Sequence, residues 1–343
     1  MKEIKCVVWD LDHTLWDGIL SEGDPVKLKD GITEIIKELD HRGILLSVSS
    51  KNNMSDAMAQ LEQFGLKEYF LYPQINWSPK SESMKIIKDK LNIGMDTFLF
   101  IDDQGFEREE VASIHPDIRT LNAAEYHSLL TMPALNPKML TAESQRRRLM
   151  YMEEEIRQEE EKYSETPRTF LERLNMKFTI AKANMEDLKR AEELTVRTNQ
   201  LNSTGIQYGY QQLEQFMTDP DYCLLVCELT DRFGSYGKIG LVLLETRTDI
   251  WKIKLLLMSC RIVSRGVGTV LLSYIMKTAK AAGKRLQAEF KKTGRNRQMM
   301  IAYQLANFIE VGRDKDELLL ENDLSTIQPY PPYIEIIASD QLV

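Results

Sequence analysis

The sequence predicts an α/β domain with a parallel sheet, followed by a second domain of the α+β class. In the first third of the chain, apolar runs of strand length alternate with helical patterns of about 10–15 residues, which is typical of βαβ units. After residue 169, several strand-like runs follow one another before the next long helix. The length of 343 residues also favours two domains, because single domains usually hold about 100–150 residues.

Composition excludes several classes of protein. The chain has 43% hydrophobic and 28% charged residues, as soluble proteins do, and its net charge of −8 argues against a general nucleic-acid binder. The longest apolar runs, such as 253–258, are far shorter than the roughly 20 residues that span a membrane. The N-terminus has no signal-peptide pattern, and the four cysteines lack zinc-ribbon spacing and disulfide-scaffold density. We therefore expect a cytoplasmic protein with reduced thiols and no membrane or nucleic-acid partner.

Each element of the first domain has a local signature. The helix at 30–40 is amphipathic, with apolar residues at i, i+3, i+4 and i+7 from Ile32, and Gly43 is placed to end it. Ser81 is placed to cap the third helix. On these grounds we expect strands at 4–9, 44–48, 71–75 and 97–101, and helices at 30–40, 54–64, 82–91 and after residue 103.

Polar side chains follow these strands where each strand ends. They are Asp10 and Asp12, Ser50, Lys80, and Asp102 and Asp103. Because the carboxyl ends of parallel strands meet at one edge of a sheet, we expect these groups to converge there. Asp10 and Asp12, at i and i+2 of an extended segment, point to the same side and repel each other unless a cation or a proton lies between them.

This combination favours a site for a phosphoryl group and Mg²⁺. Taken singly, each residue has a simpler interpretation as a turn residue, a helix cap or a solvated surface group. Mg²⁺ prefers oxygen ligands, and a hydroxyl and an ammonium can hold phosphate oxygens as charge builds on them. Their joint occurrence at successive strand ends therefore outweighs the simpler interpretations.

The same residues resemble the four motifs of the haloacid dehalogenase (HAD) superfamily of phosphotransferases. The motifs are DLDHT, the Ser-Lys-Asn after the second strand, the isolated Lys80 and the IDD pair. The resemblance implies that Asp10 is the nucleophile, which forms an aspartyl-phosphate, and that Asp12 is the general acid/base. The short stretch 16–30 leaves no room for a large cap, so an open site for a large or protein-borne substrate is expected.

The HAD resemblance also assigns the remaining polar residues of the first domain. Phosphate binding is implied for Ser50, Lys80, Thr14 and Asn52. Ser50 is preferred to Ser49 as the motif hydroxyl, although both follow the strand. The implied magnesium ligands are Asp10, Asp12 (through its carbonyl), Asp102 and Asp103.

Between the domains lies a charged segment. Prolines interrupt the pattern at 130–137, and one long helix is expected at about 141–163 with a solvated face supported by Glu153 and Arg157. These changes divide the chain into a phosphatase-like domain at 1–135, a helical linker at 136–168 and a second domain at 169–343.

The second domain resembles the GNAT acyltransferase fold in the order of its elements. The expected strands are 177–181, 223–229, 237–246 and 251–258, and the expected helices are 185–198, 210–217 and 269–282. The last helix begins near Arg265-Gly-Val-Gly268, which is similar to the turn that presents backbone N–H groups to a pyrophosphate in that fold.

Cys260 differs from the other cysteines in its surroundings. It follows a strand, precedes a helix and is flanked by Arg261 with Arg265 nearby, and such cationic surroundings favour a reactive thiolate. Cys6, Cys223 and Cys227 instead lie in apolar strands, where a cysteine is usually a small buried hydrophobe.

Nearly the whole chain resembles the FkbH-like family of polyketide pathways, including antibiotic pathways. The segments that carry the resemblance are VVWDLDHTLWDG, INWSPKSES, LNIGMDTFLFIDDQGFERE, NQLNSTG, DRFGSYGKIG, MSCRIVSRGV and AEFKKTGRN. It implies that Cys260 takes the 3-phosphoglyceryl group of 1,3-bisphosphoglycerate as a thioester and that the HAD site removes the phosphate. The glyceryl unit then passes to the phosphopantetheine thiol of an acyl carrier protein. Substrate or thioester binding is implied for Asn199, Asn202, Arg261, Arg265, Glu289, Thr293 and Asn296.

Two alternatives remain. The chain could be a HAD phosphatase of a soluble phosphometabolite whose second domain is a non-catalytic recognition module. It could also be a non-enzymatic scaffold, but the complete set of motif residues argues against that, since degenerate enzymes normally lose at least one.

Overall fold

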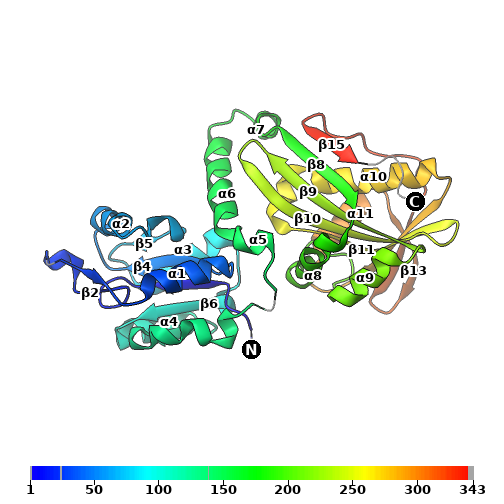
Figure 1. The fold of residues 1–343 in the computed structure, drawn as a ribbon. Coiled ribbons are helices and arrows are strands. Elements are labelled where there is room, and N and C mark those ends of the chain that lie inside the picture. The colour runs from blue at the N-terminus through cyan, green and yellow to red at the C-terminus, as the bar shows by residue number, and fades with distance from the viewer. Residues whose placement is uncertain (1, 24, 138, 339–343) are drawn as a thin grey trace. The chain divides into compact units, whose positions relative to one another are not determined.

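The computed structural model describes residues 2–23, 25–137 and 139–338, without the side chains of Cys260, Arg261 and Val263 (Figure 1). The chain divides into two compact units, Met1–Glu155 and Ile156–Val343. Each unit is described by itself below. None of the described helices is both long and apolar enough to cross a membrane.

The first unit is built on a five-stranded sheet with the order β5–β4–β1–β6–β7. All of its strand pairs are parallel. The strands are β1 (Cys6–Trp9), β4 (Leu45–Ser50), β5 (Gln74–Ile75), β6 (Phe98–Asp102) and β7 (Arg119–Asn122). β4 and β6 each run one or two residues beyond their expected ends, whereas β5 keeps only the last two of its five expected residues. β1 lies in the middle, so the residues that follow it emerge at the centre of the sheet edge.

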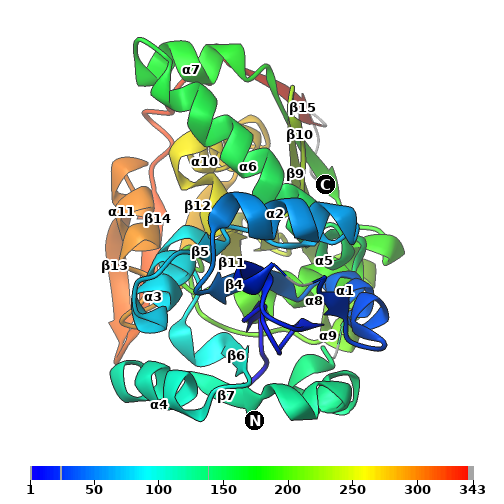
Figure 2. The ribbon, with the colours of Figure 1, turned by 90° about the vertical axis from the view of Figure 1, so that its left-hand side faces the viewer.

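Helices cover both faces of this sheet, as Figure 2 shows from the side. They are α1 (Ile32–His41), α2 (Met54–Gln63), α3 (Lys80–Leu91) and α4 (Gly105–Ile114). Val7 and Trp9 pack in the core that contains α1 and α2, whereas Cys6 and Val8 pack in the core that contains α3 and α4. Burial on both faces explains why β1 is apolar at every position.

The connection between Asp12 and α1 is short. Its described residues form a two-stranded hairpin of β2 (Trp16–Asp17) and β3 (Lys27–Leu28) and a 3-10 turn, Leu20–Glu22. The unit therefore has the parallel, capless α/β fold that the sequence predicts.

Two local predictions in the first unit are wrong. α3 begins at Lys80 with Pro79 as its N-cap, and the Ser81 side chain donates to Glu110 instead of capping the helix. The charged helix is interrupted at Arg146, which separates α5 (Ala142–Gln145) from α6 (Arg147–Lys162). Thr141 caps α5 through a reciprocal capping box with Ser144.

α6 crosses the division between the two units. Its residue Arg157 is 1% exposed, because the guanidinium donates to both carboxylate oxygens of Asp231 at 2.7 and 2.9 Å and lies 4.0 Å from the Tyr236 ring centroid. The prediction that Arg157 belongs to a solvated face is therefore wrong. A bidentate partner far along the chain is invisible to a helical spacing rule.

The second unit contains an eight-stranded sheet with the order β13–β14–β12–β11–β10–β9–β8–β15. Its strands are β8 (Met176–Lys182), β9 (Tyr222–Asp231), β10 (Gly234–Glu245), β11 (Ile250–Met258), β12 (Arg285–Lys291), β13 (Ile309–Asp314), β14 (Glu317–Asn322) and β15 (Ile334–Ala338). The helices are α7 (Pro167–Arg173), α8 (Leu188–Arg197), α9 (Tyr210–Thr218), α10 (Val267–Ala281) and α11 (Arg297–Leu305). β8 to β11 are antiparallel, and α10 connects β11 to the parallel β12.

β11 and β12 pair only from Ile250–Ile253 to Arg285–Ala288 and then separate. Beyond that point the segment 201–203 lies between them. Ser203 N donates to Leu256 O at 2.9 Å, and Ser203 O accepts from Lys291 N at 2.9 Å. Apart from this splayed parallel pair and the parallel β8–β15 pair at one edge, the sheet is antiparallel, and the unit has the α+β fold that the sequence predicts.

Candidate active sites

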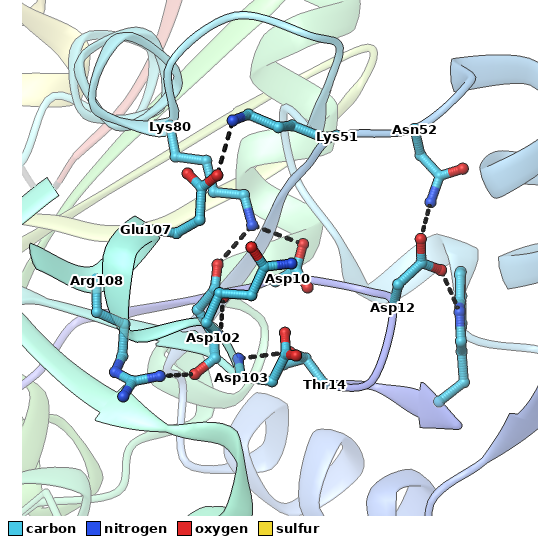
Figure 3. Close-up of polar contacts among 12 residues, drawn as sticks. Asp10, Asp12, Thr14, Lys51, Asn52, Lys80, Asp102, Asp103, Glu107 and Arg108 are labelled. Carbon is cyan, nitrogen blue, oxygen red and sulfur yellow. Dashed lines mark hydrogen bonds and ion pairs between the residues drawn. The ribbon is translucent and has the colours of Figure 1, made fainter. Parts of the chain in front are cut away.

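The first site is a buried cluster at the carboxyl edge of the parallel sheet. Asp10 follows β1, Asp102 ends β6 and Lys80 opens α3. Lys80 Nζ donates to Asp10 Oδ1 at 2.8 Å and to Asp102 Oδ2 at 2.5 Å (Figure 3). All three side chains are buried, so water screens their charges only weakly.

The electrostatics of this cluster favour an added cation. Burial raises the pKa of Asp10, although Lys80 opposes that shift. Burial, followed by the charge of Asp10, raises the pKa of Asp102 to about 6. Burial disfavours the charge on Lys80, but the Asp10 and Asp102 carboxylates outweigh it and raise the pKa of the ammonium. One ammonium thus serves two carboxylates that a divalent cation would also stabilise.

The donor set fits Mg²⁺. Asp10, Asp102 and Asp103 each offer a carboxylate oxygen, and these oxygens lie within 4.8 Å of one another. Hard oxygen ligands with room for water are what Mg²⁺ prefers. The Asp12 side chain is not a member of this group. Thr14 supports the cluster from the side, since its Oγ1 accepts from Asp103 N at 3.1 Å.

The end of β4 distinguishes the two candidate hydroxyls. Ser50 is buried, and its side chain is hydrogen-bonded to Asp10. Ser49 Oγ is also buried but has no hydrogen-bond partner among the described residues. Neighbouring residues of a strand point to opposite faces, so only Ser50 reaches the cluster.

Asp12 lies apart from the cluster. Its Oδ1 accepts from Trp16 Nε1 at 2.8 Å and from Leu20 N at 3.1 Å, and its Oδ2 accepts from Asn52 Nδ2 at 2.8 Å. In Figure 3 the Asp12 side chain points toward Asn52 and away from Lys80. Asn52 is predicted to bind phosphate, but its amide donates to Asp12, the predicted acid/base.

Several supporting contacts escape the sequence pattern. Lys51 Nζ donates to Glu107 Oε1 at 2.7 Å, and Arg108 Nη1 donates to the Asp102 carbonyl oxygen at 2.6 Å. Trp16, which donates to Asp12, is a further residue that the sequence did not single out. Their place near the motifs in the chain was the only available signal, because spacing does not give the direction of a side chain.

In the second unit, two predicted substrate residues hold the backbone. The Asn202 side chain donates to Thr198 O at 3.2 Å and accepts from Thr204 N at 3.1 Å and Gly205 N at 2.8 Å. Asn296 Nδ2 donates at 2.9 Å both to Asn202 O and to Lys291 O. Both amides are buried, so here they fasten the segment 201–203 to the end of β12.

The other predicted residues of this unit are dispersed. Asn199 is exposed, Glu289 accepts from Lys254, and Thr293 N donates to Asn296 Oδ1 at 3.1 Å. Arg265 is buried, with its guanidinium 5.0 Å from the Phe170 ring centroid and 3.9 Å from a Glu161 carboxylate oxygen.

The side chains of Cys260 and Arg261 lie outside the described part of the structure. The Cys260 backbone begins a 3-10 helix, Cys260–Arg265, which comes before α10. The cysteine therefore does not lie in the first turn of α10. Gly266, with φ of +81°, joins the two.

A cavity of about 320 Å³ lies along α10 and α11 and borders this turn. Met258 and Ile262, the residues on either side of the Cys260 position, both line it. Its other walls are mainly apolar, with Leu272 and Met276 from α10 and Ala302 from α11. The sequence did not predict this cavity. One of its walls is α11, which is not among the expected helices, and residue spacing gives no signal for a space between two helices.

Comparison with known proteins agrees with the geometry of the first site. Residues 13–109 match the family model of the haloacid dehalogenase-like hydrolases. Over this stretch the first unit is similar to the haloacid dehalogenase-like hydrolases. The matched stretch contains Ser50, Lys80 and Asp102 and begins directly after Asp12. Human magnesium-dependent phosphatase 1 is 27% identical over 119 residues, which cover 29% of this chain and 68% of that protein.

Two solved structures are each similar to a part of this chain. A Bacteroides fragilis structure, the N-terminal part of a protein containing a phosphatase domain complexed with Mg, is 29% identical, covers 39% of this chain and has a TM-score of 0.34. This chain spans only 40% of that structure's length. The Escherichia coli ribosomal-protein-S18-alanine N-acetyltransferase is 14% identical, with 43% of this chain and 95% of that chain covered and a TM-score of 0.35.

Proposed function

We propose that this chain is a two-site enzyme that holds an acyl group on Cys260 and dephosphorylates it with Asp10, as in the FkbH-like family. The observation that supports it most directly is the buried cluster in which Lys80 Nζ contacts both Asp10 and Asp102. Mg²⁺ and a phosphoryl group are the ligands that this donor set suits. The proposed location is the cytoplasm.

The phosphatase step uses groups of this chain in two displacements. Lys80 holds Oδ1 of Asp10, and a carboxylate oxygen of Asp10 attacks phosphorus as the bond to the leaving oxygen breaks. Asp12 gives its proton to the leaving oxygen. Water then attacks the aspartyl-phosphate, Asp12 takes the water's proton, and inorganic phosphate leaves. When bound by Asp10, Asp102 and Asp103, Mg²⁺ would neutralise charge on the phosphoryl oxygens.

The acyl-transfer steps are assigned to Cys260. Its thiolate attacks the acyl carbon of 1,3-bisphosphoglycerate, and the acyl phosphate bond breaks with release of inorganic phosphate. After the HAD site removes the 3-phosphate, the phosphopantetheine thiol of an acyl carrier protein attacks the thioester and releases Cys260. The apolar cavity lined by Met258 and Ile262 supports this assignment, because it offers room for a narrow arm near the backbone position of Cys260.

Intact-mass measurement after mixing with 1,3-bisphosphoglycerate tests the proposal. Wild type is expected to gain a glyceryl adduct, Asp10→Asn a phosphoglyceryl adduct, and Cys260→Ala none. An adduct that persists in Cys260→Ala would exclude this cysteine as the acceptor. Complete dephosphorylation by Asp10→Asn would exclude Asp10 as the nucleophile.

A second candidate is a phosphatase of a soluble phosphometabolite with a non-catalytic second unit. It is favoured by the likeness to magnesium-dependent phosphatase 1, of which the match covers 68%. Under this alternative, Cys260→Ala leaves turnover of the natural substrate unchanged and no carrier protein is required.

A further inference from the structure

The carboxylate of Asp12 is held by donors from three separate segments. Trp16 Nε1 comes from β2, Leu20 N from the turn after it, and Asn52 Nδ2 from the loop after β4. Two of these donors contact Oδ1 and one contacts Oδ2. Such a set of donors fixes the plane of the carboxyl group more firmly than any single hydrogen bond could.

Burial adds weight to this arrangement. Trp16 is 0% exposed and Asn52 is 2% exposed, so water hardly competes for these contacts. Asn52 Oδ1 has no hydrogen-bond partner among the described residues, although leaving a buried acceptor unpaired is unfavourable. Turning the amide over would bring that oxygen against Asp12 Oδ2, so the unpaired oxygen is the consequence of aiming the amino group at Asp12.

We propose that Asn52 and Trp16 are positioning residues for Asp12, which set the direction in which it exchanges a proton. The inference rests on the proposed phosphatase function and deepens it. Two donors occupy Oδ1, so Oδ2 is the oxygen left to carry the proton. Asn52 donates to one lone pair of Oδ2, so the proton is bound at the other lone pair. The plane of the carboxyl group fixes the direction in which that lone pair points.

This role differs from the phosphate binding that the sequence predicts for Asn52. A residue that holds phosphate contributes to every phosphomonoester alike. A residue that positions the general acid contributes only where the leaving oxygen needs a proton as its bond to phosphorus breaks. An alkoxide leaving group needs that proton, whereas nitrophenolate departs without it.

Single-turnover kinetics with two substrates separates these roles. The rate of phosphoryl transfer to Asp10 is measured in excess enzyme with Mg²⁺, using an alkyl phosphomonoester and p-nitrophenyl phosphate. Asn52→Ala is expected to slow the alkyl substrate about 10- to 100-fold, a part of the usual effect of general acids, and the nitrophenyl substrate less than threefold. Trp16→Phe, which keeps the packing ring and removes the donor, should give the same pattern.

Asn53→Ala is the matched control. Asn53 is the next residue and caps α2 by accepting from Ser55 N and Asp56 N, but in the described part of the chain it makes no hydrogen bond to Asp12. It is expected to lower the melting temperature slightly without a dependence on the leaving group. Thermal unfolding of each variant separates misfolding from an effect on the step.

Any one of four outcomes would overturn the inference. If Asn52→Ala lowers the rate equally with both substrates, or raises only KM for both, Asn52 binds phosphate and does not position Asp12. Unchanged alkyl rates in both folded variants would remove the positioning role. If wild type shows no hydrolysis that depends on Asp10, the proposed function fails and this inference fails with it.

Discussion

Lys80 is the residue on which the buried cluster of Asp10, Lys80 and Asp102 depends. It is the cation that the structure places between Asp10 and Asp102, with donor distances of 2.8 and 2.5 Å. Removing one partner of a buried ion pair leaves an uncompensated buried charge. This is far more unfavourable than replacing the whole pair by apolar residues. The stability of the first unit and the activity of its site are therefore coupled through one side chain.

Lys80→Met should lower both the stability of the first unit and the activity of its site. Without metal, the free energy of unfolding is expected to fall by about 3 kcal/mol, and saturating Mg²⁺ should restore part of it. Hydrolysis should fall at least about 100-fold, since charge on the phosphoryl oxygens loses a partner. Urea unfolding with and without Mg²⁺ measures the first effect. Lys85→Met, an exposed lysine of the same helix, is the control and should change neither.

Asp102 gives the protein a pH dependence that Mg²⁺ should remove. Burial and the nearby charge of Asp10 raise its folded-state pKa from 3.8 to about 6. Between these values the folded state binds a proton that the unfolded state lacks, so the stability from this group is present at low pH and lost as pH rises through about 6.

Comparison with Asp102→Asn isolates this contribution. In metal-free samples, the unfolding free energy of wild type relative to the variant should rise as pH is lowered from 7 to 5, by up to about 1.4 kcal/mol per pH unit. A difference that stays flat over this range in EDTA would contradict the assignment. A slope that survives saturating Mg²⁺ would show that the carboxylate does not bind the ion.

At the scale of elements, β4 shows how a strand sorts neighbouring residues. Ser49 and Ser50 are consecutive and both buried, yet only Ser50 bonds to Asp10. Ser50→Ala is expected to lower kcat at least about tenfold, since a donor to the reacting groups is lost. Ser49→Ala should stay within twofold and change the unfolding free energy by less than about 1 kcal/mol, because it removes an unpaired hydroxyl. Steady-state kinetics and urea unfolding of the two variants provide the test.

Periodicity and strand ends account for most of what the sequence predicts well. The alternation of apolar runs and helices gives the parallel sheet, and the sheet edge brings Asp10, Lys80 and Asp102 together. Those predictions succeed because they depend on backbone geometry, which local pattern encodes.

The predictions that fail or fall short depend on side-chain direction. Asn52 and Asp12 are 40 residues apart and meet through their rotamers, which no spacing rule describes. Asn202 and Asn296 are polar residues in loops, a pattern shared by ligand sites and by loops that must pair their own backbone. Arg157 has its partner 74 residues away, on a strand whose register the sequence does not reveal.

At the scale of the whole molecule, two compact units share one chain, and α6 runs from one to the other. The Arg157–Asp231 pair lies within the second unit, with both side chains at most 1% exposed. Each unit has its own core clusters. We therefore expect a defect in the second unit to leave the chemistry of the first unit intact.

Arg157→Met tests this independence. It should lower the unfolding free energy of the second unit by about 3–5 kcal/mol, because Asp231 is left buried without its cation. Hydrolysis of p-nitrophenyl phosphate should stay within twofold of wild type. Arg168→Met, which removes an exposed arginine paired with Glu172, is the control. A proportional loss of phosphatase activity in the folded Arg157→Met protein would refute the independence of the units.

The segment 201–203 has a consequence for motion. It is loop by sequence, but its backbone is bonded to Leu256 and Met258 of β11 and to Lys291 of β12. Amide hydrogen exchange at Ser203, Leu256, Met258 and Lys291 should therefore be slow and should speed up together, as in one cooperative unit. This stretch would then be a rigid wall between β11 and β12, and any opening toward a ligand would have to come from another segment.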